Sequence, residues 1–382
     1  MFKSNGTRHR LQRSGHYNVS LAFHDPARVC NSDPANFAFI AGFARARRTR
    51  RRGQRMSVEA RIGAVSTGPM LSAETRVRAD LALLARFGFG PAADAQASTL
   101  GLAFLGGQLH EELWQLPGAL RQGRRGDILW RQAGGLLYLE CVLPDLGNID
   151  PASLAEDAYR QLLEAAQVHG CPKLLRAWNY MSGINLGDGD QERYRRFCLG
   201  RAQALEAAGI DVPELCAGTA IGGDDPHLRI MLLAGTKAGI NIENPRQVSA
   251  YHYPRSYGPR SPSFARATAL PRSDGQVLLM ISGTASVVGH ETVHEGDLDA
   301  QIEEIRLNVD ALLGESVGRL ERPALARFDS NSLVRVYVRH AEDWPRIEAR
   351  LAEIWPGVPL VGLRGDICRA DLLLEVEAVL AG

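Results

Sequence analysis

From Met56 onward, short β-rich runs separated by turn residues alternate with longer amphipathic stretches, and this alternation most constrains the fold. Short runs of this kind predict strands, and long stretches with helical periodicity predict helices. A chain of 382 residues that contains both kinds of element predicts an α/β (α+β) fold and is long enough for two domains.

The first half contains several well-marked elements. Residues 126–143 predict two strands joined by a Gly-Gly turn. Residues 150–170 predict a helix, because Asp150 suits the N-cap, Pro151 suits the first turn and a glycine ends the stretch. Residues 173–185 then predict a buried strand, and residues 188–209 predict a second helix.

The second half repeats this order of elements. The predicted strands are at about 216–222, 228–235, 276–288, 333–338 and 371–379, and the predicted helices are at about 297–313 and 342–354. A boundary near residue 212 would give an N-terminal α/β domain over 56–212 and a C-terminal domain over 213–382.

The charge distribution singles out the start of the chain. The formal net charge is +1, yet residues 1–55 hold twelve Lys or Arg and two acids. This segment shows no sustained periodicity and Met56 follows it directly, so we expect 1–55 to be a disordered or non-native leader. A regulatory tail and a nucleic-acid arm are the alternatives.

Several classes of protein are disfavoured by composition. The six cysteines form no CxxC pair, which predicts reduced thiols. No apolar run is long enough to cross a bilayer, and the first thirty residues lack the apolar stretch of a signal peptide, so we expect a cytoplasmic protein. No glycine-rich phosphate loop follows a strand, and we predict no cofactor and no membrane partner.

The segment His290-Glu-Thr-Val-His294 fits the HExxH pattern of zinc metalloproteases. The zinc site requires a helix, which brings the two histidines to one face. Here the motif follows a strand-like run and precedes Asp297, a predicted N-cap, so we expect a turn or strand end. A substrate contact by His290 is a further alternative.

Two segments carry groups suited to a small acid. Tyr194 and Arg201 are seven residues apart on a predicted helix and share a face, although a solvated surface pair would have the same spacing.

Residues 250–267 combine tyrosines and arginines with Pro, Ser and Gly, which is typical of an ordered loop. Arginine pairs with carboxylates and tyrosine supplies a rigid hydroxyl, so this loop suits a small cyclic acid. A structural loop and a nucleic-acid surface are the alternatives, and the negative balance of residues 56–382 disfavours the second.

The C-terminal strand places two carboxylates on one face. Period-two alternation puts Leu372, Leu374 and Val376 on one side, with Leu373, Glu375 and Glu377 on the other. In an apolar pocket, burial and a like-charged neighbour would both raise the pKa of Glu375 and suit it to donate a proton. A solvated strand face is the alternative.

These segments resemble two related families. Residues 281–313, 334–356 and 368–380 resemble the reactive-intermediate deaminase superfamily over roughly 275–382. The segments 176–185 and 190–205, with 242–267 and the same C-terminal strand, resemble the chorismatases, which are built on that superfamily's fold. The likeness implies a two-domain chorismatase whose C-terminal domain resembles the YjgF/chorismate-mutase-like fold.

The resemblance also implies roles for individual residues. It implies that Glu375 is the catalytic acid and protonates the enolpyruvyl group of chorismate, so that pyruvate leaves. The residues that it implies for binding chorismate are Tyr194, Arg201, Tyr253 and Arg266.

Cys368 bears on the product. Members of the family that make hydroxybenzoates have a cysteine at this position, whereas the simple hydrolases have a small apolar residue. The resemblance therefore implies a catalytic role for Cys368 and 3-hydroxybenzoate as the product, with 4-hydroxybenzoate as a second product in one branch. A buried structural cysteine is the alternative.

Several functions remain open at this point. They are the chorismatase, with chorismate as its small-molecule partner in a monomer or small homo-oligomer; hydrolysis of chorismate to a dihydroxycyclohexadiene carboxylate; an imine or enamine deaminase; a zinc metalloprotease; and a non-catalytic binding protein.

Overall fold

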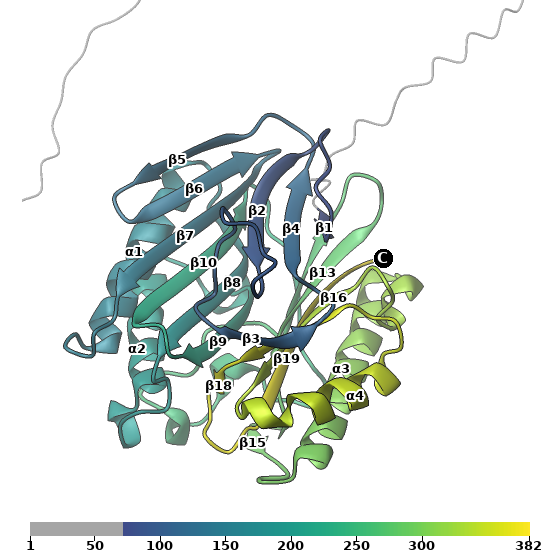
Figure 1. Ribbon diagram of the computed structural model, residues 1–382. Coiled ribbons are helices and arrows are strands. Elements are labelled where there is room, and N and C mark those ends of the chain that lie inside the picture. Colours follow the sequence, from purple (N-terminus) through teal and green to yellow (C-terminus); the bar gives the residue numbers. More distant parts are fainter. Residues whose placement is uncertain (1–71) are drawn as a thin grey trace, which may run out of the picture. The chain divides into compact units, whose positions relative to one another are not determined.

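The computed structural model describes residues 72–382, whose strands form two large sheets (Figure 1). The first sheet has seven strands in the order β18 (Asp366–Ile367), β9 (Ala217–Gly223), β8 (Lys173–Ser182), β10 (His227–Gly235), β7 (Leu136–Pro144), β6 (Ile128–Ala133) and β5 (Arg121–Arg125). The second sheet has seven strands in the order β11 (Ile240–Ile242), β12 (Ala267–Pro271), β13 (Val277–Thr284), β19 (Leu374–Ala381), β16 (Leu333–Val338), β17 (Leu360–Arg364) and β3 (Ala103–Gly107).

The remaining strands of the described residues form two smaller sheets. One has three strands in the order β1 (Ser72–Glu74), β4 (Glu111–Leu116) and β2 (Ala82–Gly88). The other pairs β14 (Val287–Val288) with β15 (Glu291–Thr292). The mixture of strands and helices confirms the predicted α/β (α+β) fold class.

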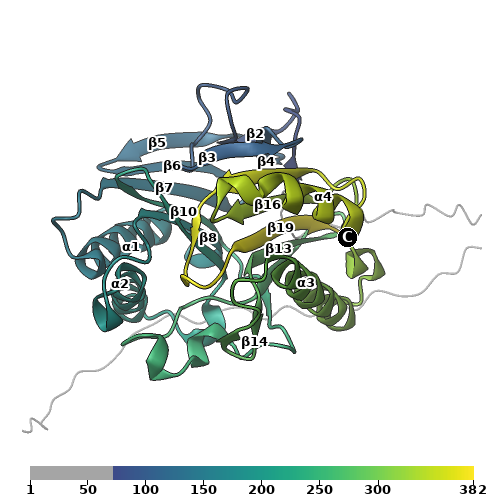
Figure 2. The same cartoon turned by 60° about the horizontal axis from the view of Figure 1, so that its bottom comes forward.

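The helices α1 (Pro151–Val168) and α2 (Arg193–Ala207) cover one face of the first sheet (Figure 2). The start of α1 is as predicted, because the Asp150 side chain accepts a hydrogen bond from the Ala152 N–H and Pro151 occupies the first turn. The second predicted helix begins later than expected, after a short 3₁₀ turn at Gly189–Gln191. It connects the parallel strands β8 and β9, which need such a crossover.

The helices α3 (Leu298–Leu320) and α4 (Trp344–Ile354) pack on the second sheet and share its apolar core. Asp297 caps α3 as predicted. The predicted end near Leu313 is wrong, because the helix continues to Leu320 while Val317 and Leu320 pack on the core. It ends where Glu321 takes a left-handed conformation, with φ of 54°.

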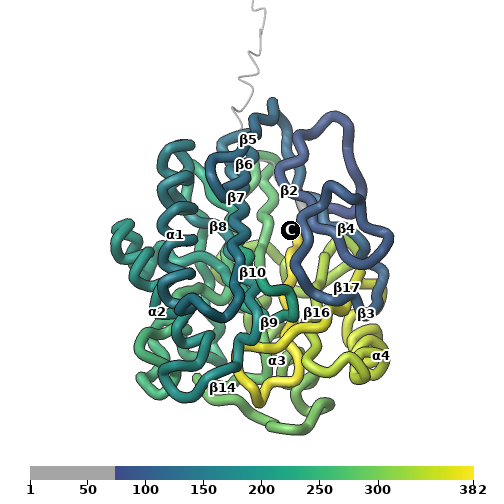
Figure 3. Tube along the Cα trace, turned by 60° about the vertical axis from the view of Figure 1, so that its left-hand side comes forward, coloured from purple at the N-terminus to yellow at the C-terminus, as the bar shows by residue number. Residues whose placement is uncertain are grey.

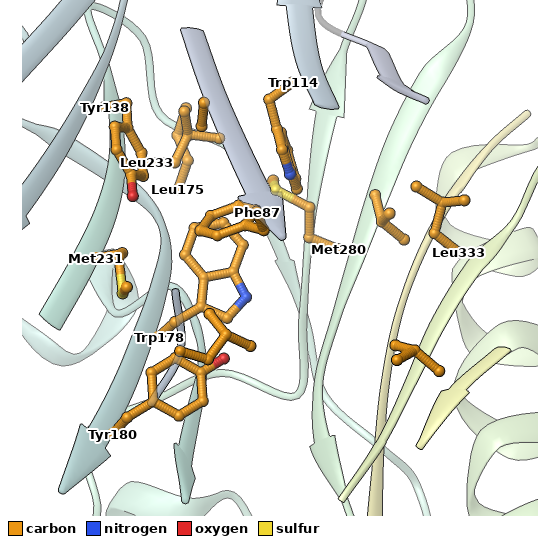
Figure 4. Close-up of a cluster of buried hydrophobic side chains, with 14 of the residues drawn as sticks. Phe87, Trp114, Tyr138, Leu175, Trp178, Tyr180, Met231, Leu233, Met280 and Leu333 are labelled. Atoms are coloured by element: carbon orange, nitrogen blue, oxygen red, sulfur yellow. The ribbon is translucent and has the colours of Figure 1, made fainter. Parts of the chain in front are cut away.

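Between the sheets lies a third apolar cluster, rich in aromatic side chains (Figure 4). It joins Phe87 of β2 and Trp114 of β4 to Tyr138 and Trp178 of the first sheet and Met280 of the second. Aromatic contacts reinforce it, with the Phe87 and Trp178 rings 5.2 Å apart between centroids. The three-stranded sheet therefore packs against both large sheets.

The large sheets do not divide the chain at the predicted boundary near residue 212. The strands β9 and β10 follow that position, yet they pair with β8 and β7 of the first sheet. Conversely, β3 comes early in the chain and lies beside β17 at the edge of the second sheet (Figure 3). The described residues 72–382 all belong to one unit, and the division into 56–212 and 213–382 stays a prediction.

Two further expectations concern the chain as a whole. The predicted leader over residues 1–55 lies outside the described residues. Within residues 72–382, no helix is both long and apolar enough to cross a membrane.

Candidate active site

A cavity of about 570 Å³ lies where the first sheet meets the second. Here β9 is tied to the neighbouring strands, because Gly218 N–H donates to Ser282 Oγ at 2.9 Å and Ala217 N–H donates to Thr268 Oγ1 at 2.8 Å. The cavity is lined by all six residues predicted from the sequence, namely Glu375, Cys368, Tyr194, Arg201, Tyr253 and Arg266.

Glu375 projects from β19 into this cavity. Its neighbours Leu374 and Val376 pack on the other side, in the core formed with α3 and α4, which confirms the predicted alternation for these residues. Leu372 precedes the strand and joins the cluster between the sheets instead, so its predicted place beside Leu374 is wrong. Glu375 is only 5% exposed, so the strand face is not solvated.

The room for the Glu375 carboxyl comes from a glycine. Strand β13 changes register opposite β19 between Ile281 and Thr284, which is a local irregularity of the kind often found beside active sites. A Cβ added at Gly283 would lie 1.8 Å from Glu375 Oε1. Only glycine therefore allows the carboxyl to occupy this position.

Burial determines the protonation of Glu375. Burial, and after it the neighbouring Glu377 carboxylate, raise the pKa of this carboxyl to about 8, although Arg176 and Arg266 oppose the shift. Both causes predicted from the sequence are confirmed. Glu375 can therefore hold a proton near neutral pH and donate it to a bound molecule.

Helix α2 supplies a second wall, with Tyr194 and Arg201 on its cavity side as their spacing predicts. The Arg201 guanidinium is 5% exposed, lies 5.1 Å from the centre of the Tyr159 ring and has a buried Nε without a hydrogen-bond partner among the described residues. Burial raises the pKa of the Tyr194 phenol well above its usual value, so this hydroxyl stays protonated.

The loop predicted to bind a small acid forms the third wall. Arg266 is 6% exposed and donates hydrogen bonds to Val248 O at 2.9 Å and to Tyr253 Oη at 2.8 Å. Its Nε, like that of Arg201, is buried without a partner in residues 72–382. Arg255 and Arg260 instead form exposed ion pairs outside the cavity.

Cys368 lies on a segment that Arg339 holds in place. The Arg339 guanidinium donates to the backbone oxygens of Leu372, Ile367 and Arg369 at 2.7, 3.1 and 2.8 Å. Burial, and after it the nearby Glu375, raise the pKa of the Cys368 thiol to about 12. The thiol is therefore neutral and is a poor nucleophile.

These groups together suit one kind of chemistry. Two buried guanidiniums can each take a carboxylate, tyrosine hydroxyls can orient the molecule, and a protonated carboxyl stands beside it. The cavity can thus bind a small dianion and protonate it.

Comparisons with known proteins agree with this geometry. The family model described as "Chorismatase FkbO/Hyg5-like, N-terminal" matches residues 112–234. A 3-hydroxybenzoate synthase from Streptomyces hygroscopicus is 38% identical over 279 residues, which are 70% of this chain and 80% of the relative. A chorismatase from Streptomyces rapamycinicus is 39% identical over 279 residues, which are 71% of this chain and 82% of the relative. The chain belongs to the chorismatase family. A crystal structure of a chorismatase also matches with a TM-score of 0.68 and 32% identity, over 82% of this chain and 98% of that chain.

Membership of the chorismatase family confirms the prediction that the protein is an enzyme. It also agrees with the backbone at the HExxH motif. Residues Glu291–Thr292 form the short strand β15 and His294 has a φ of 62°, so the segment is not the helix that the zinc site requires. His290 contacts Tyr257, which lines the cavity, with Tyr257 Oη and His290 Nδ1 3.3 Å apart.

Sequence analysis missed several polar residues of this chorismatase. Arg176 of β8 and Arg335 of β16 are buried and form ion pairs with Glu377, while Thr219 of β9 lines the cavity. A signal was present for the arginines, because each is a charge in the interior of a mainly apolar run that was predicted to be a strand. Their partners could not be inferred, since Arg176 and Glu377 are 201 residues apart in sequence.

Proposed function

We propose that the protein cleaves chorismate to 3-hydroxybenzoate and pyruvate, with 4-hydroxybenzoate as a second product. The observation that carries this proposal is the buried Glu375, whose pKa is raised by burial, in a cavity that also contains Arg201 and Arg266, each with a buried Nε that has no hydrogen-bond partner among the described residues. The curated relatives are named 3-hydroxybenzoate synthase and chorismatase, which supports chorismate as the substrate.

Binding uses the two charges of the substrate. Chorismate carries two carboxylates, and Arg201 and Arg266 are the cavity groups suited to take one each. The hydroxyls of Tyr194 and Tyr253 fix its orientation. Tyr253 is already in place, because its hydroxyl accepts a hydrogen bond from Arg266.

The reaction begins with a proton from Glu375. This proton adds to the enolpyruvyl methylene, which becomes a methyl group, and the resulting oxocarbenium ion weakens the ether bond to the ring. Pyruvate leaves with the ether oxygen. The ring hydroxyl lies on the carbon next to the one that carried the ether, so loss of a ring proton with this hydroxyl in place gives 4-hydroxybenzoate. For 3-hydroxybenzoate, the hydroxyl oxygen first moves to the carbon that lost the ether, and the ring then loses a proton on becoming aromatic. In both cases the proton that is lost restores the acid, and the two products together contain all the atoms of chorismate.

Cys368 selects the product. As a neutral thiol beside Glu375, it acts through its shape and weak polarity and not as a nucleophile. We propose that it favours aromatisation of the ring over attack by water. Hydrolysis to the dihydroxycyclohexadiene carboxylate consumes a water molecule and is the alternative outcome at the same site.

The test is to incubate the full chain with chorismate, without added metal or nucleotide, and to follow pyruvate and ring products by chromatography. We expect 3-hydroxybenzoate with an equal amount of pyruvate. If the diene were the main product, chorismate would still be the substrate, but the proposed role of Cys368 in product selection would be refuted. Unchanged chorismate would contradict the proposal and favour the deaminase or the binding protein.

The raised pKa of Glu375 predicts how the activity depends on pH. Glu375 must be protonated to act and its pKa is raised to about 8, so the protonated form predominates below that pH. We therefore expect kcat to be highest below this value and to fall as the pH rises through about 8. An ordinary glutamate would already have lost activity several pH units lower. Pyruvate release measured in overlapping buffers, with protein stability followed in parallel, tests this profile.

A further inference from the structure

Glu375 has a carboxylate neighbour on the same face of β19. Residues two apart along a strand point to one side, so Glu377 lies next to Glu375. Glu377 does not line the cavity and is 3% exposed. On this face of β19, one carboxyl therefore faces the cavity and a second lies directly behind it.

Glu377 is held by three side chains from three other strands. Its Oε2 lies 2.5 Å from Arg176 Nη2 of β8 and accepts a hydrogen bond from Thr219 Oγ1 of β9 at 2.5 Å. Its Oε1 lies 2.9 Å from Arg335 Nη1 of β16. Ion pairs with two guanidiniums fix Glu377 as the charged carboxylate.

The charges of this buried cluster already balance without Glu375. Arg335 also pairs with Glu112 of β4, with Arg335 Nε and Glu112 Oε2 2.9 Å apart. Two arginines therefore face two carboxylates, Glu112 and Glu377. A third carboxylate at Glu375 would have no cation of its own in the cluster, and an unpaired buried charge is costly.

Thr219 connects this buried cluster to the wall of the cavity through hydrogen bonds. Its hydroxyl donates to Glu377, accepts from Arg176 Nη2 at 2.7 Å and accepts from the Gly283 N–H at 3.1 Å. Gly283 is the residue whose missing side chain makes room for the Glu375 carboxyl. The position of Glu377 is therefore tied to the wall against which Glu375 lies.

The other titratable groups around the pair belong to the elements that pack on it. Tyr180 and Tyr337 share a hydrogen bond with 2.9 Å between their oxygens, and burial raises the pKa of both phenols, so they are neutral. Of the titratable groups that line the cavity, Arg266, Tyr194 and Cys368 interact electrostatically with Glu375. Arg266 is the cation among them, and a bound substrate carboxylate would offset it.

From this geometry we infer that Glu377 is a positioning residue, which keeps the proton of the carboxyl pair on Glu375. The inference rests on the proposed function and assigns a role to a residue that does not touch the substrate. When two carboxyls are neighbours, the one with more cationic partners keeps its charge and the other keeps the proton. Glu377 has two such partners, and Glu375 stands in the more apolar site.

The test is a titration of Glu375 in the full chain without substrate. Carbon-13 NMR of labelled glutamate carboxyls follows its protonation, and the signal is assigned by its loss in Glu375→Gln. We expect a midpoint near 8 in the wild type. In Glu377→Gln, which removes the like charge, the midpoint should fall by about one pH unit or more.

Glu112→Gln is the matched control. Glu112 is 3% exposed like Glu377 and pairs with the same Arg335, but it does not neighbour Glu375. Its replacement should leave the midpoint close to that of the wild type. Equal shifts in both variants, or no shift in Glu377→Gln, would overturn the inference.

A variant in which the midpoint should shift in the opposite direction keeps the inference testable if Glu377→Gln does not fold. Arg176→Gln removes a cation that lowers the pKa of Glu375 while Glu377 keeps Arg335 and Thr219, so the midpoint should rise. An unchanged or lower midpoint would contradict the inference even if Glu377→Gln does not fold. If the wild type leaves chorismate intact, the proposed function fails, and the titration still decides where the proton lies.

The kinetic readout separates positioning from a purely structural effect. In Glu377→Gln, the alkaline fall in kcat should move to lower pH together with the midpoint, while KM for chorismate changes little. A loss of kcat by the same factor at every pH would indicate damage to the structure and not a displaced proton.

Discussion

A glutamate that keeps its proton near neutral pH can serve as a general acid, and burial at Glu375 supplies this property through desolvation. Glu375→Gln retains the shape of the side chain but has no acidic proton. We expect it to lower kcat by about 10²–10⁴-fold, the usual contribution of general acid catalysis. Pyruvate release measures the loss, and calorimetric titration with chorismate should show that binding is retained.

The control for this variant is Glu156→Gln, which makes the same exchange at an exposed position of α1 and should leave turnover unchanged. Wild-type turnover in Glu375→Gln would remove this residue from the mechanism.

Cys368 offers a test of product selection that does not depend on rate. In Cys368→Ala the cavity gains space beside Glu375 and loses the thiol, so we expect the share of the diene to rise at the expense of hydroxybenzoate. Chromatography of the ring products measures the ratio. Cys198→Ala is the control, because Cys198 also lines the cavity but lies on α2 and has no proposed part in product selection. An unchanged ratio in Cys368→Ala would make this thiol structural.

At the residue scale, the sequence predicted what local spacing can reveal. Period-two alternation placed Glu375 and Glu377 on one face, and helical spacing placed Tyr194 and Arg201 together. The partners of Glu377 come from other strands far away in sequence, and local patterns hold no information about such contacts. The role of Gly283 could not be predicted for the same reason, because it consists in leaving room for a side chain of β19.

At the scale of elements, the contact between α1 and α2 positions the wall that carries Arg201. A Cβ added at Gly200 of α2 would lie 1.9 Å from the backbone oxygen of Ala152 of α1. Gly200→Ala must therefore push the helices apart, and we expect a loss of about 1–3 kcal/mol in the free energy of unfolding. Chemical denaturation followed by circular dichroism measures it.

The matched control has the opposite expected sign. Gly314 lies within α3, and a Cβ there would have no atom within 4 Å. Gly314→Ala should stabilise the protein by about 0.5–1 kcal/mol, because alanine restricts the unfolded chain and favours the helix. Destabilisation of similar size in both variants would contradict the steric argument.

The elements that have strong local signals were predicted well. Helix α1 has its cap and its proline where the sequence places them, and β16 spans the residues predicted. Helix α3 runs past its predicted end because packing of Val317 on the core outweighs the low helix propensity of two glycines. The membership of β3 in the second sheet depends on pairing with β17, which a local pattern cannot reveal.

At the scale of the whole described unit, a single buried arginine joins the three-stranded sheet to the second sheet. Arg335 of β16 is 1% exposed, pairs with Glu112 of β4 and Glu377 of β19, and lies over the Phe87 ring at 4.6 Å. It therefore links elements from both ends of residues 72–382. A side chain that holds two buried carboxylates cannot be removed without leaving them uncompensated.

Arg335→Met keeps much of the apolar stem but leaves Glu112 and Glu377 with fewer cations than negative charges. We expect a loss of about 3–5 kcal/mol in the free energy of unfolding, as is usual when one partner of a buried ion pair is removed. The control is Arg306→Met on α3, whose pairs with Glu303 and Asp310 are partly exposed and should contribute about 1 kcal/mol or less. Denaturant unfolding of both variants measures the two losses. They can be compared when the free energy of unfolding falls with the same slope against denaturant concentration in both variants. Similar losses would mean that Arg335 contributes no more than a surface ion pair, and the junction of the sheets would then depend on the aromatic cluster alone.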